Sequence, residues 1–66
     1  MQILLNGEPF KADSTLTVAA LVEQLGLAGK RVAVEVNKEI VPRSEHSQHQ
    51  LQDEDKVEVV AAIGGG

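Results

Sequence analysis

The stretch LTVAALVEQLG, residues 16–26, constrains the fold of this chain more than any other segment. Its apolar residues recur at the spacing of one face of an amphipathic helix: Val18, Leu21, Val22 and Leu25. Thr17 is the expected N-cap, Leu16 has the spacing of a hydrophobic staple with Leu21, and Gly26 supplies a left-handed residue that ends a helix. The pattern therefore predicts one helix in this segment.

The beginning of the chain alternates with the two-residue period of a strand. In MQILLN, Met1, Ile3 and Leu5 fall on one face, and the Asn6-Gly7 pair that follows is a strong hairpin signal. A second strand is therefore expected near Glu8–Ala12. Because Pro9 has no N–H to donate, this second strand is expected at a sheet edge.

The second half of the chain predicts three more strands. RVAVEVN, residues 31–37, alternates with its valines on one side, and residues 39–41 form a short strand closed by Pro42. KVEVVAAI, residues 56–63, forms the last strand. Its inward-facing residues are expected to be Val57, Val59 and Ala61.

The segment between the last two of these strands is mostly polar. Ser44 is expected to cap a brief helical turn that runs through His46, and residues 52–55 are expected to turn. Leu51 is the one strongly apolar residue of this loop. We therefore expect Leu51 to anchor the loop to the core.

This order of elements predicts an α+β fold, in which the helix covers one face of a sheet and the last strand pairs beside the first. In that register three aliphatic residues point to the other face: Leu4, Val60 and Ala62. Scattered exposed aliphatics are normal, whereas an apolar patch on adjacent strands marks a docking surface. The sequence leaves both interpretations open.

Composition limits the classes of fold and function. The 66 residues include no cysteine, which excludes a disulfide, a thiolate metal site and a cysteine nucleophile. The single aromatic residue is one phenylalanine, so the core must be aliphatic. A net charge of -4 opposes binding to nucleic-acid phosphates. The amino-terminal residues lack the features of a secretory signal, and no apolar run reaches the length of a membrane span, so a cytosolic protein is expected.

No combination of residues predicts a catalytic or metal centre. The serines and threonines occur outside any Gly-x-Ser-x-Gly setting and are expected in turns and caps. His46 and His49 fit one side of a helical turn, but a metal site normally takes three or four ligands. Residues 53–55 are all acidic but lack the spacing of a calcium loop, so we expect them to be solvated.

The sequence closes with Gly64, Gly65 and Gly66, directly after an aliphatic strand. Residues without a Cβ atom can thread a narrow channel, and they leave the last carbonyl carbon open to attack. From Ile63 to Gly66 the segment can extend about 13 Å at roughly 3.3 Å per residue, which is enough to reach into a partner's active site. A frayed end or an engineered scar is the competing interpretation.

Together these residues resemble the ThiS family, the ubiquitin-like sulfur carrier proteins of thiamine biosynthesis. The resemblance covers the whole chain, and its parts are MQILLNGEPF, the helix TVAALVEQL, the acidic turn before KVEVVAAI, and the terminal Gly65-Gly66. NKEIVPR, residues 37–43, is the most specific internal element. The chain departs from the family pattern at Glu54, where many relatives have glycine, and in the additional Gly64.

The resemblance implies a ubiquitin-like β-grasp domain over residues 1–62, with a mixed sheet of four to five strands and one main helix, and a flexible tail over residues 63–66. It implies a protein co-substrate that is not an enzyme and binds no cofactor. An E1-like adenylyltransferase of the ThiF type would adenylate Gly66 with Mg-ATP, and a cysteine-derived persulfide would convert it to a thiocarboxylate. The thiocarboxylate would donate sulfur to a thiazole synthase of the ThiG type.

The resemblance also assigns roles to other residues. Gly64 and Gly65 would form the slim arm that threads into partner active sites. Arg43 would either contact a partner or brace the turn at Pro42. Acidic surface residues would steer association with basic partners, among them Glu35 and Glu58. The docking face would comprise Leu4, Val60 and Ala62.

Three alternative functions remain open from the sequence. The small subunit of molybdopterin synthase uses the same terminal chemistry for another cofactor. A ubiquitin-like modifier would instead join Gly66 to a lysine through an isopeptide bond. A plain interaction domain with an irrelevant glycine tail belongs to a different class of protein.

Overall fold

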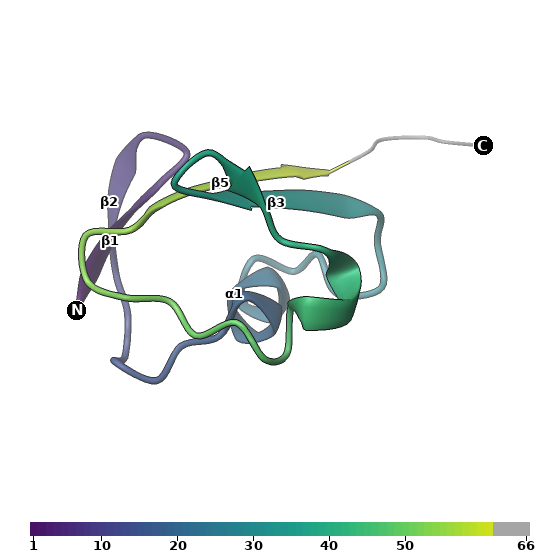
Figure 1. Ribbon diagram of the computed structural model, residues 1–66, viewed down its shortest axis with the longest axis horizontal. Helices are drawn as coiled ribbons and strands as arrows, with labels where there is room; N and C mark the ends of the chain where they lie inside the picture. Colours follow the sequence, from purple (N-terminus) through teal and green to yellow (C-terminus); the bar gives the residue numbers. More distant parts are fainter. Residues whose placement is uncertain (62–66) are drawn as a thin grey trace.

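The computed structural model describes residues 1–61 and forms one mixed sheet with a helix against one face (Figure 1). The five strands lie in the order β2-β1-β5-β3-β4; β1 and β5 run parallel, and the other neighbours are antiparallel. The elements along the chain are β1 (Gln2–Leu5), β2 (Glu8–Lys11), α1 (Val18–Gln24), β3 (Val32–Val36), β4 (Glu39–Ile40), a 3₁₀ turn (Arg43–Glu45) and β5 (Lys56–Ala61). This arrangement confirms the predicted α+β class and the pairing of the last strand with the first.

Helix α1 begins and ends where the sequence predicts. The Thr17 side-chain Oγ1 accepts a hydrogen bond from the Ala20 N–H at 3.1 Å, as an N-cap does. At the other end Gly26 has φ +74°, its N–H donates to the Glu23 carbonyl, and the Leu27 N–H donates to the Val22 carbonyl. These two bonds form a Schellman motif, which satisfies carbonyls that the helix end leaves open.

The β1–β2 hairpin turns through Asn6 and Gly7, which both have positive φ, 51° and 85°. Two consecutive left-handed residues match a type I′ turn, which explains why the Asn-Gly pair is effective here. Strand β2, with Pro9, lies at the edge of the sheet as predicted. The hairpin therefore leaves β1 free to pair with β5 on its other side.

The core between the sheet and α1 is aliphatic. Its largest fully buried side chains are Ile3, Val18, Leu21, Val34, Leu51 and Val57. Leu51 is 1% exposed, which confirms that it anchors the loop before β5. In β5 the alternation is clear, because Val57 and Val59 are buried while Lys56, Glu58 and Val60 are exposed.

The prediction that Ser44 caps a helical turn is wrong. The turn is a 3₁₀ turn that contains Ser44, and Pro42 occupies the capping position without any side-chain hydrogen bond. The Pro42 carbonyl accepts from the Glu45 N–H at 2.8 Å, so the backbone itself closes the turn. Proline favours this start because its fixed φ suits the residue that leads into a helical turn.

The acidic turn before β5 keeps its left-handed residue although it lacks glycine. Glu54 has φ +70°, and its N–H donates to the Gln2 carbonyl at 2.7 Å. The Gln2 N–H in turn donates to Asp53 Oδ1 at 2.8 Å. These two bonds hold the turn against β1 and offset the strain of a side chain in this conformation.

Candidate functional site

The face of the sheet away from α1 is the candidate site, and we call it the outer face. Strand register places Leu4 opposite Lys56, and Val60 opposite Ala33, with all four side chains on this face. Val60 is 65% exposed and Leu4 is half-buried. The predicted orientation of Leu4 and Val60 is therefore confirmed, while Ala62 lies outside the described residues.

Among the described residues, the outer face carries one large exposed aliphatic residue that the sequence analysis did not assign to it. Ile40 is 70% exposed and lies opposite Glu35 in the β3–β4 pair. The signal was the two-residue turn through Asn37 and Lys38, since a hairpin of that length fixes which residues stand opposite each other. Ile40 extends the apolar surface of the outer face to the β4 edge.

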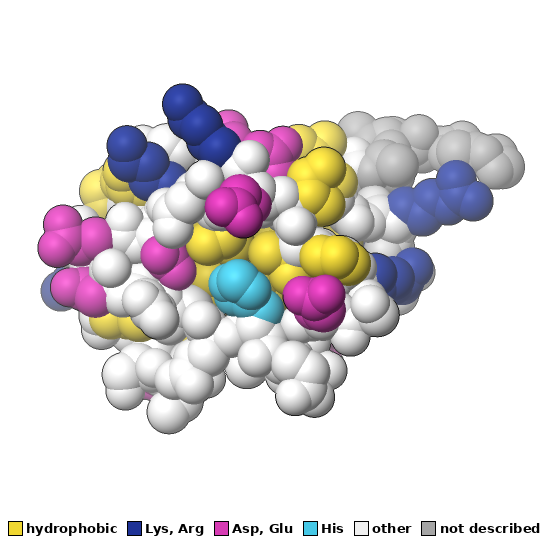
Figure 2. All heavy atoms as spheres, in the orientation of Figure 1, with side chains coloured by type: hydrophobic (Ala, Val, Ile, Leu, Met, Phe, Trp, Pro, Cys, Tyr) yellow, Lys and Arg dark blue, Asp and Glu magenta, His cyan; other side chains and the backbone are white. Residues whose placement is uncertain are grey.

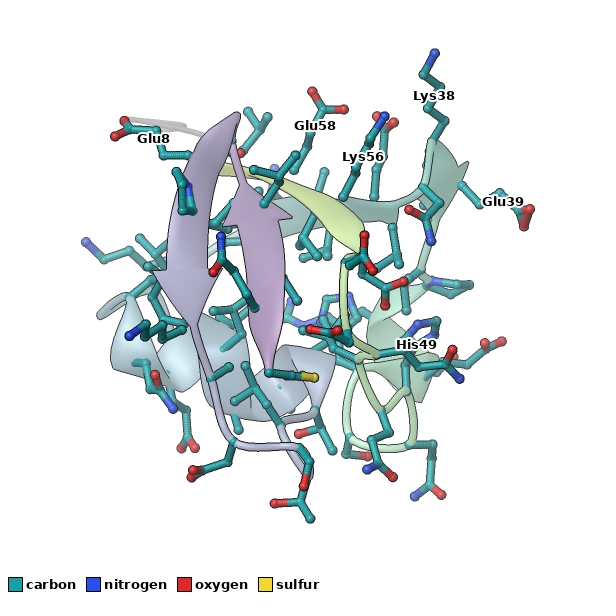
Figure 3. All side chains as sticks on the ribbon, turned by 90° about the vertical axis from the view of Figure 1, so that its left-hand side faces the viewer. Glu8, Lys38, Glu39, His49, Lys56 and Glu58 are labelled. Atoms are coloured by element: carbon teal, nitrogen blue, oxygen red, sulfur yellow. The ribbon has the colours of Figure 1, made fainter. Side chains whose placement is uncertain are left out.

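Charged side chains stand among these aliphatic residues. Glu58 projects from β5 away from α1, together with Lys56, and Lys38 projects on the same side from the β3–β4 turn (Figure 3). The upper rim of the molecule accordingly shows basic, acidic and hydrophobic side chains side by side (Figure 2). The outer face is therefore mixed in character.

A shallow hollow lies on the outer face between β1 and β5. Its volume is about 190 Å³, and it is lined by Leu4, Gly7, Lys38, Lys56, Val57 and Glu58. Leu4 brings an apolar side chain to this lining, and Lys38, Lys56 and Glu58 bring charged ones. This hollow has room for a single side chain of a partner protein.

Strand β5 lies at the centre of the sheet, and its last described residue, Ala61, pairs with Val32. Strand β5 therefore runs along the middle of the sheet and ends, among the described residues, at Ala61 (Figure 1). The predicted site residues Gly64, Gly65 and Gly66 lie outside the described residues.

The two histidines have different surroundings. His46 is 8% exposed, and its Nε2 lies 3.0 Å from the Val41 carbonyl, so it braces the loop after β4. His49 lines an open hollow of about 510 Å³ beside Glu45 and Asp55. Within residues 1–61, no group of three or more histidine, cysteine or acidic side chains is placed to hold a metal ion.

Arg43 begins the 3₁₀ turn directly after Pro42. It lines a hollow of about 340 Å³ together with Lys30 and His46. Both interpretations of Arg43, a partner contact and a brace for the Pro42 turn, stay predictions. None of the helices in the described part of the chain combines the length and the apolar character needed to cross a membrane.

Comparison with known proteins identifies the family to which this chain belongs. The model of the ThiS family matches residues 3–66. The sulfur carrier protein ThiS of Escherichia coli is 38% identical over 66 residues, which cover the whole of both chains. The crystal structure of the thiamine biosynthesis protein (ThiS) from Geobacter metallireducens superimposes with a TM-score of 0.82 at 33% identity, again over the whole of both chains.

Two longer proteins also match. A thiazole synthase of Paramagnetospirillum magneticum and one of Magnetococcus marinus are each 47% identical over 66 residues. The chain spans about a fifth of the length of these two proteins, since the match covers 20% of each. With a family match over nearly every residue and the same fold in a solved relative, the chain belongs to the ThiS family and has its ubiquitin-like β-grasp fold.

Proposed function

We propose that this chain is a cytosolic sulfur carrier protein in the biosynthesis of the thiazole moiety of thiamine, a co-substrate that partner enzymes charge and unload. The observation that carries the proposal is its similarity over its whole length to a sulfur carrier protein, at 38% identity. The central position of β5, which leads toward the three glycines, supports it further. Because β5 is hydrogen-bonded to β1 on one side and to β3 on the other, it is a stable strand from which the glycines extend.

The proposed reaction takes place at the carboxylate of Gly66. A carboxylate is a poor electrophile, so an E1-like adenylyltransferase first joins it to the α-phosphate of Mg-ATP and releases pyrophosphate. The terminal sulfur of a cysteine-derived persulfide then attacks the acyl carbon and displaces AMP. Cleavage of the sulfur–sulfur bond by a thiol reductant leaves the thiocarboxylate, which donates its sulfur to thiazole synthase.

The chain's own contribution is to present the carboxylate of Gly66 to its partner enzymes. Gly64 and Gly65 form a thin arm that enters the active site of each partner, and Gly66 carries the reacting group. Leu4, Val60 and Ala62 dock the domain so that the arm is aimed correctly. The ATP and the magnesium ion belong to the activating partner, because this chain needs only to supply a carboxylate and later a nucleophilic sulfur.

The test follows the mass of the chain. The chain ending at Gly66 is incubated with the adenylyltransferase of the same organism, Mg-ATP, a persulfide donor and a thiol reductant, and its intact mass is measured. We expect a species heavier by one sulfur-for-oxygen exchange. Removal of Gly66 abolishes this species while the circular dichroism spectrum stays unchanged, because all the helices and strands of the described residues end by Ala61.

The control is Thr15→Ala, an exposed substitution away from the outer face, which keeps the mass gain. A mass gain that persists without Gly66 would refute the proposed site. Conjugates of this chain with lysine residues of other proteins would support a ubiquitin-like modifier instead.

A further inference from the structure

The Asn6-Gly7 pair of the β1–β2 turn combines a reactive sequence with a restraining structure. The chain has two asparagines, and only Asn6 is followed by glycine, because Asn37 is followed by Lys38. The side-chain amide of an asparagine can be attacked by the main-chain nitrogen of the next residue. Glycine in that next position leaves the nitrogen accessible, because it has no Cβ atom. Of the two asparagines, Asn6 is therefore the one whose sequence favours loss of its side-chain amide.

This reaction, deamidation, consumes water and releases ammonia. The Gly7 nitrogen gives up its proton and bonds to the Asn6 Cγ atom, the Cγ–Nδ2 bond breaks, and Nδ2 leaves with that proton as ammonia. Water then opens the cyclic imide at either of its carbonyl carbons and restores the Gly7 N–H. One opening converts Asn6 to aspartate, and the other converts it to isoaspartate, in which the main chain runs through the former side-chain carbon. The reaction needs no oxidant or reductant.

The fold holds the Asn6 amide away from this reaction. Its Oδ1 accepts a hydrogen bond from the Val59 N–H at 2.8 Å, and its Nδ2 donates to the Val59 carbonyl at 3.3 Å. We call these two hydrogen bonds the Asn6 clamp. They direct both ends of the amide toward β5, the neighbour of β1 in the sheet, whereas the attack requires Cγ to turn back against the Gly7 nitrogen. The reaction must therefore wait until the clamp opens.

We propose that Asn6 is the deamidation site of this chain and that opening of the Asn6 clamp sets the rate of the reaction. Two hydrogen bonds between neutral groups correspond to a protection of about tenfold to a hundredfold. The Val59 amide measures the opening independently, because it exchanges its hydrogen with solvent only when its bond to Asn6 is broken. Deamidation of Asn6 and hydrogen exchange at Val59 should therefore be slowed by the same factor in the folded chain.

Deamidation would weaken the attachment of β5 to the β1–β2 turn. Aspartate keeps Oδ1 as the acceptor for the Val59 N–H, but it places a carboxylate oxygen against the Val59 carbonyl, to which Nδ2 had donated. Isoaspartate also lengthens the main chain within a two-residue turn whose residues both have positive φ. We therefore expect the deamidated chain, separated by anion exchange through its added negative charge, to have a lower Tm than the parent.

The experiment compares the folded chain with the same chain in guanidinium chloride, both incubated at mildly alkaline pH. Trypsin places the two asparagines in separate peptides, residues 1–11 and 32–38, and mass spectrometry of each peptide follows the replacement of NH by O. In guanidinium chloride, Asn6 should react about tenfold faster than Asn37 or more. In the folded chain the Asn6 rate should fall by about tenfold or more, and by a factor within about threefold of the protection of the Val59 amide.

The matched variant is Gly7→Lys, which gives Asn6 the same successor that Asn37 has. Asn37 and Lys38 already form a two-residue turn with positive φ at both residues, 52° and 70°, and a Cβ atom added at Gly7 would meet no atom within 4 Å. In guanidinium chloride, Asn6 of this variant should react at the rate of Asn37, within about threefold. This measurement is made on the unfolded chain, so it does not depend on how well the variant folds.

Three outcomes would overturn the proposal. Equal rates for Asn6 and Asn37 in guanidinium chloride would show that Gly7 does not direct the reaction. An Asn6 rate that is the same in the folded chain and in guanidinium chloride would show that the clamp does not protect. A folded-chain rate far below the value that Val59 exchange predicts would assign the protection to the backbone of the turn and not to the clamp. The sulfur-carrier function is independent of these outcomes, since the mass measurement at Gly66 tests it.

Discussion

Asn6 acts at the scale of a single residue to join two strands that are far apart in sequence. Its backbone turns the β1–β2 hairpin, while its side chain reaches across to β5: the Val59 N–H donates to Oδ1 at 2.8 Å, and Nδ2 donates to the Val59 carbonyl at 3.3 Å. Asn37 plays a related part on the other side of β5, where Oδ1 accepts from the Lys56 N–H at 3.0 Å. Side-chain amides thus continue the pairing of β5 where the neighbouring backbone turns away.

We predict that Asn6→Gly lowers the free energy of unfolding by about 1 to 2 kcal/mol, because it keeps the positive φ but removes both hydrogen bonds to Val59. Urea denaturation gives the stability, and hydrogen exchange of the Val59 amide should accelerate. Asn6→Asp is the matched control, since it retains the acceptor oxygen and should lose less. An Asn6→Gly variant as stable as the parent would show that these bonds contribute nothing.

At the scale of an element, α1 depends on its surroundings. Seven residues are too few for a helix that is stable in isolation. Its first amides find acceptors in the loop before β5, since Val18 N–H donates to the His49 carbonyl at 2.9 Å and Ala19 N–H to the His46 carbonyl at 3.0 Å. The following amide, of Ala20, bonds the Thr17 side chain. The helix and the loop therefore hold each other in place.

Thr17→Ala should lower the free energy of unfolding by about 1 kcal/mol, because the Ala20 amide then loses its acceptor at the helix start. Thr15→Ala serves as the control: it removes the same atoms from an exposed residue two positions earlier and should change stability by less than about 0.5 kcal/mol. Chemical denaturation of both variants checks the difference. Equal stabilities would contradict the capping role.

At the scale of the whole molecule, the order of elements and the core follow from local patterns. The period of residues 16–26, the Asn-Gly turn and the isolated Leu51 predicted α1, the hairpin and the loop anchor correctly. The side-chain bonds of Asn6 to β5, and the position of Glu35 opposite Glu58 across β3 and β5, depend on strand register, which short patterns do not contain. Ser44 failed as a cap because Pro42 already set the backbone of that turn.

Leu51→Ala should be the most destabilising of the substitutions considered for stability, with a loss of about 2 to 4 kcal/mol. Leu51 is fully buried, and its N–H donates to the Leu16 carbonyl at 2.8 Å, so the cavity opens next to the start of α1. A domain of this size has a small margin of stability. The control Val60→Ala trims an exposed aliphatic residue and should have little effect. Thermal unfolding of the two variants tests this, and similar Tm values would show that Leu51 is not a core anchor.

The parallel pairing of β1 with β5 has a mechanical consequence. These are the first and last strands of the described chain, and β5 is bonded along its length to β3 as well. A pull along β5 at its far end, resisted at β1, loads these hydrogen bonds sideways, so that they share the force instead of opening one after another like a zipper. A load applied at the end of β5 is therefore shared across the centre of the sheet, so the domain resists it as a unit.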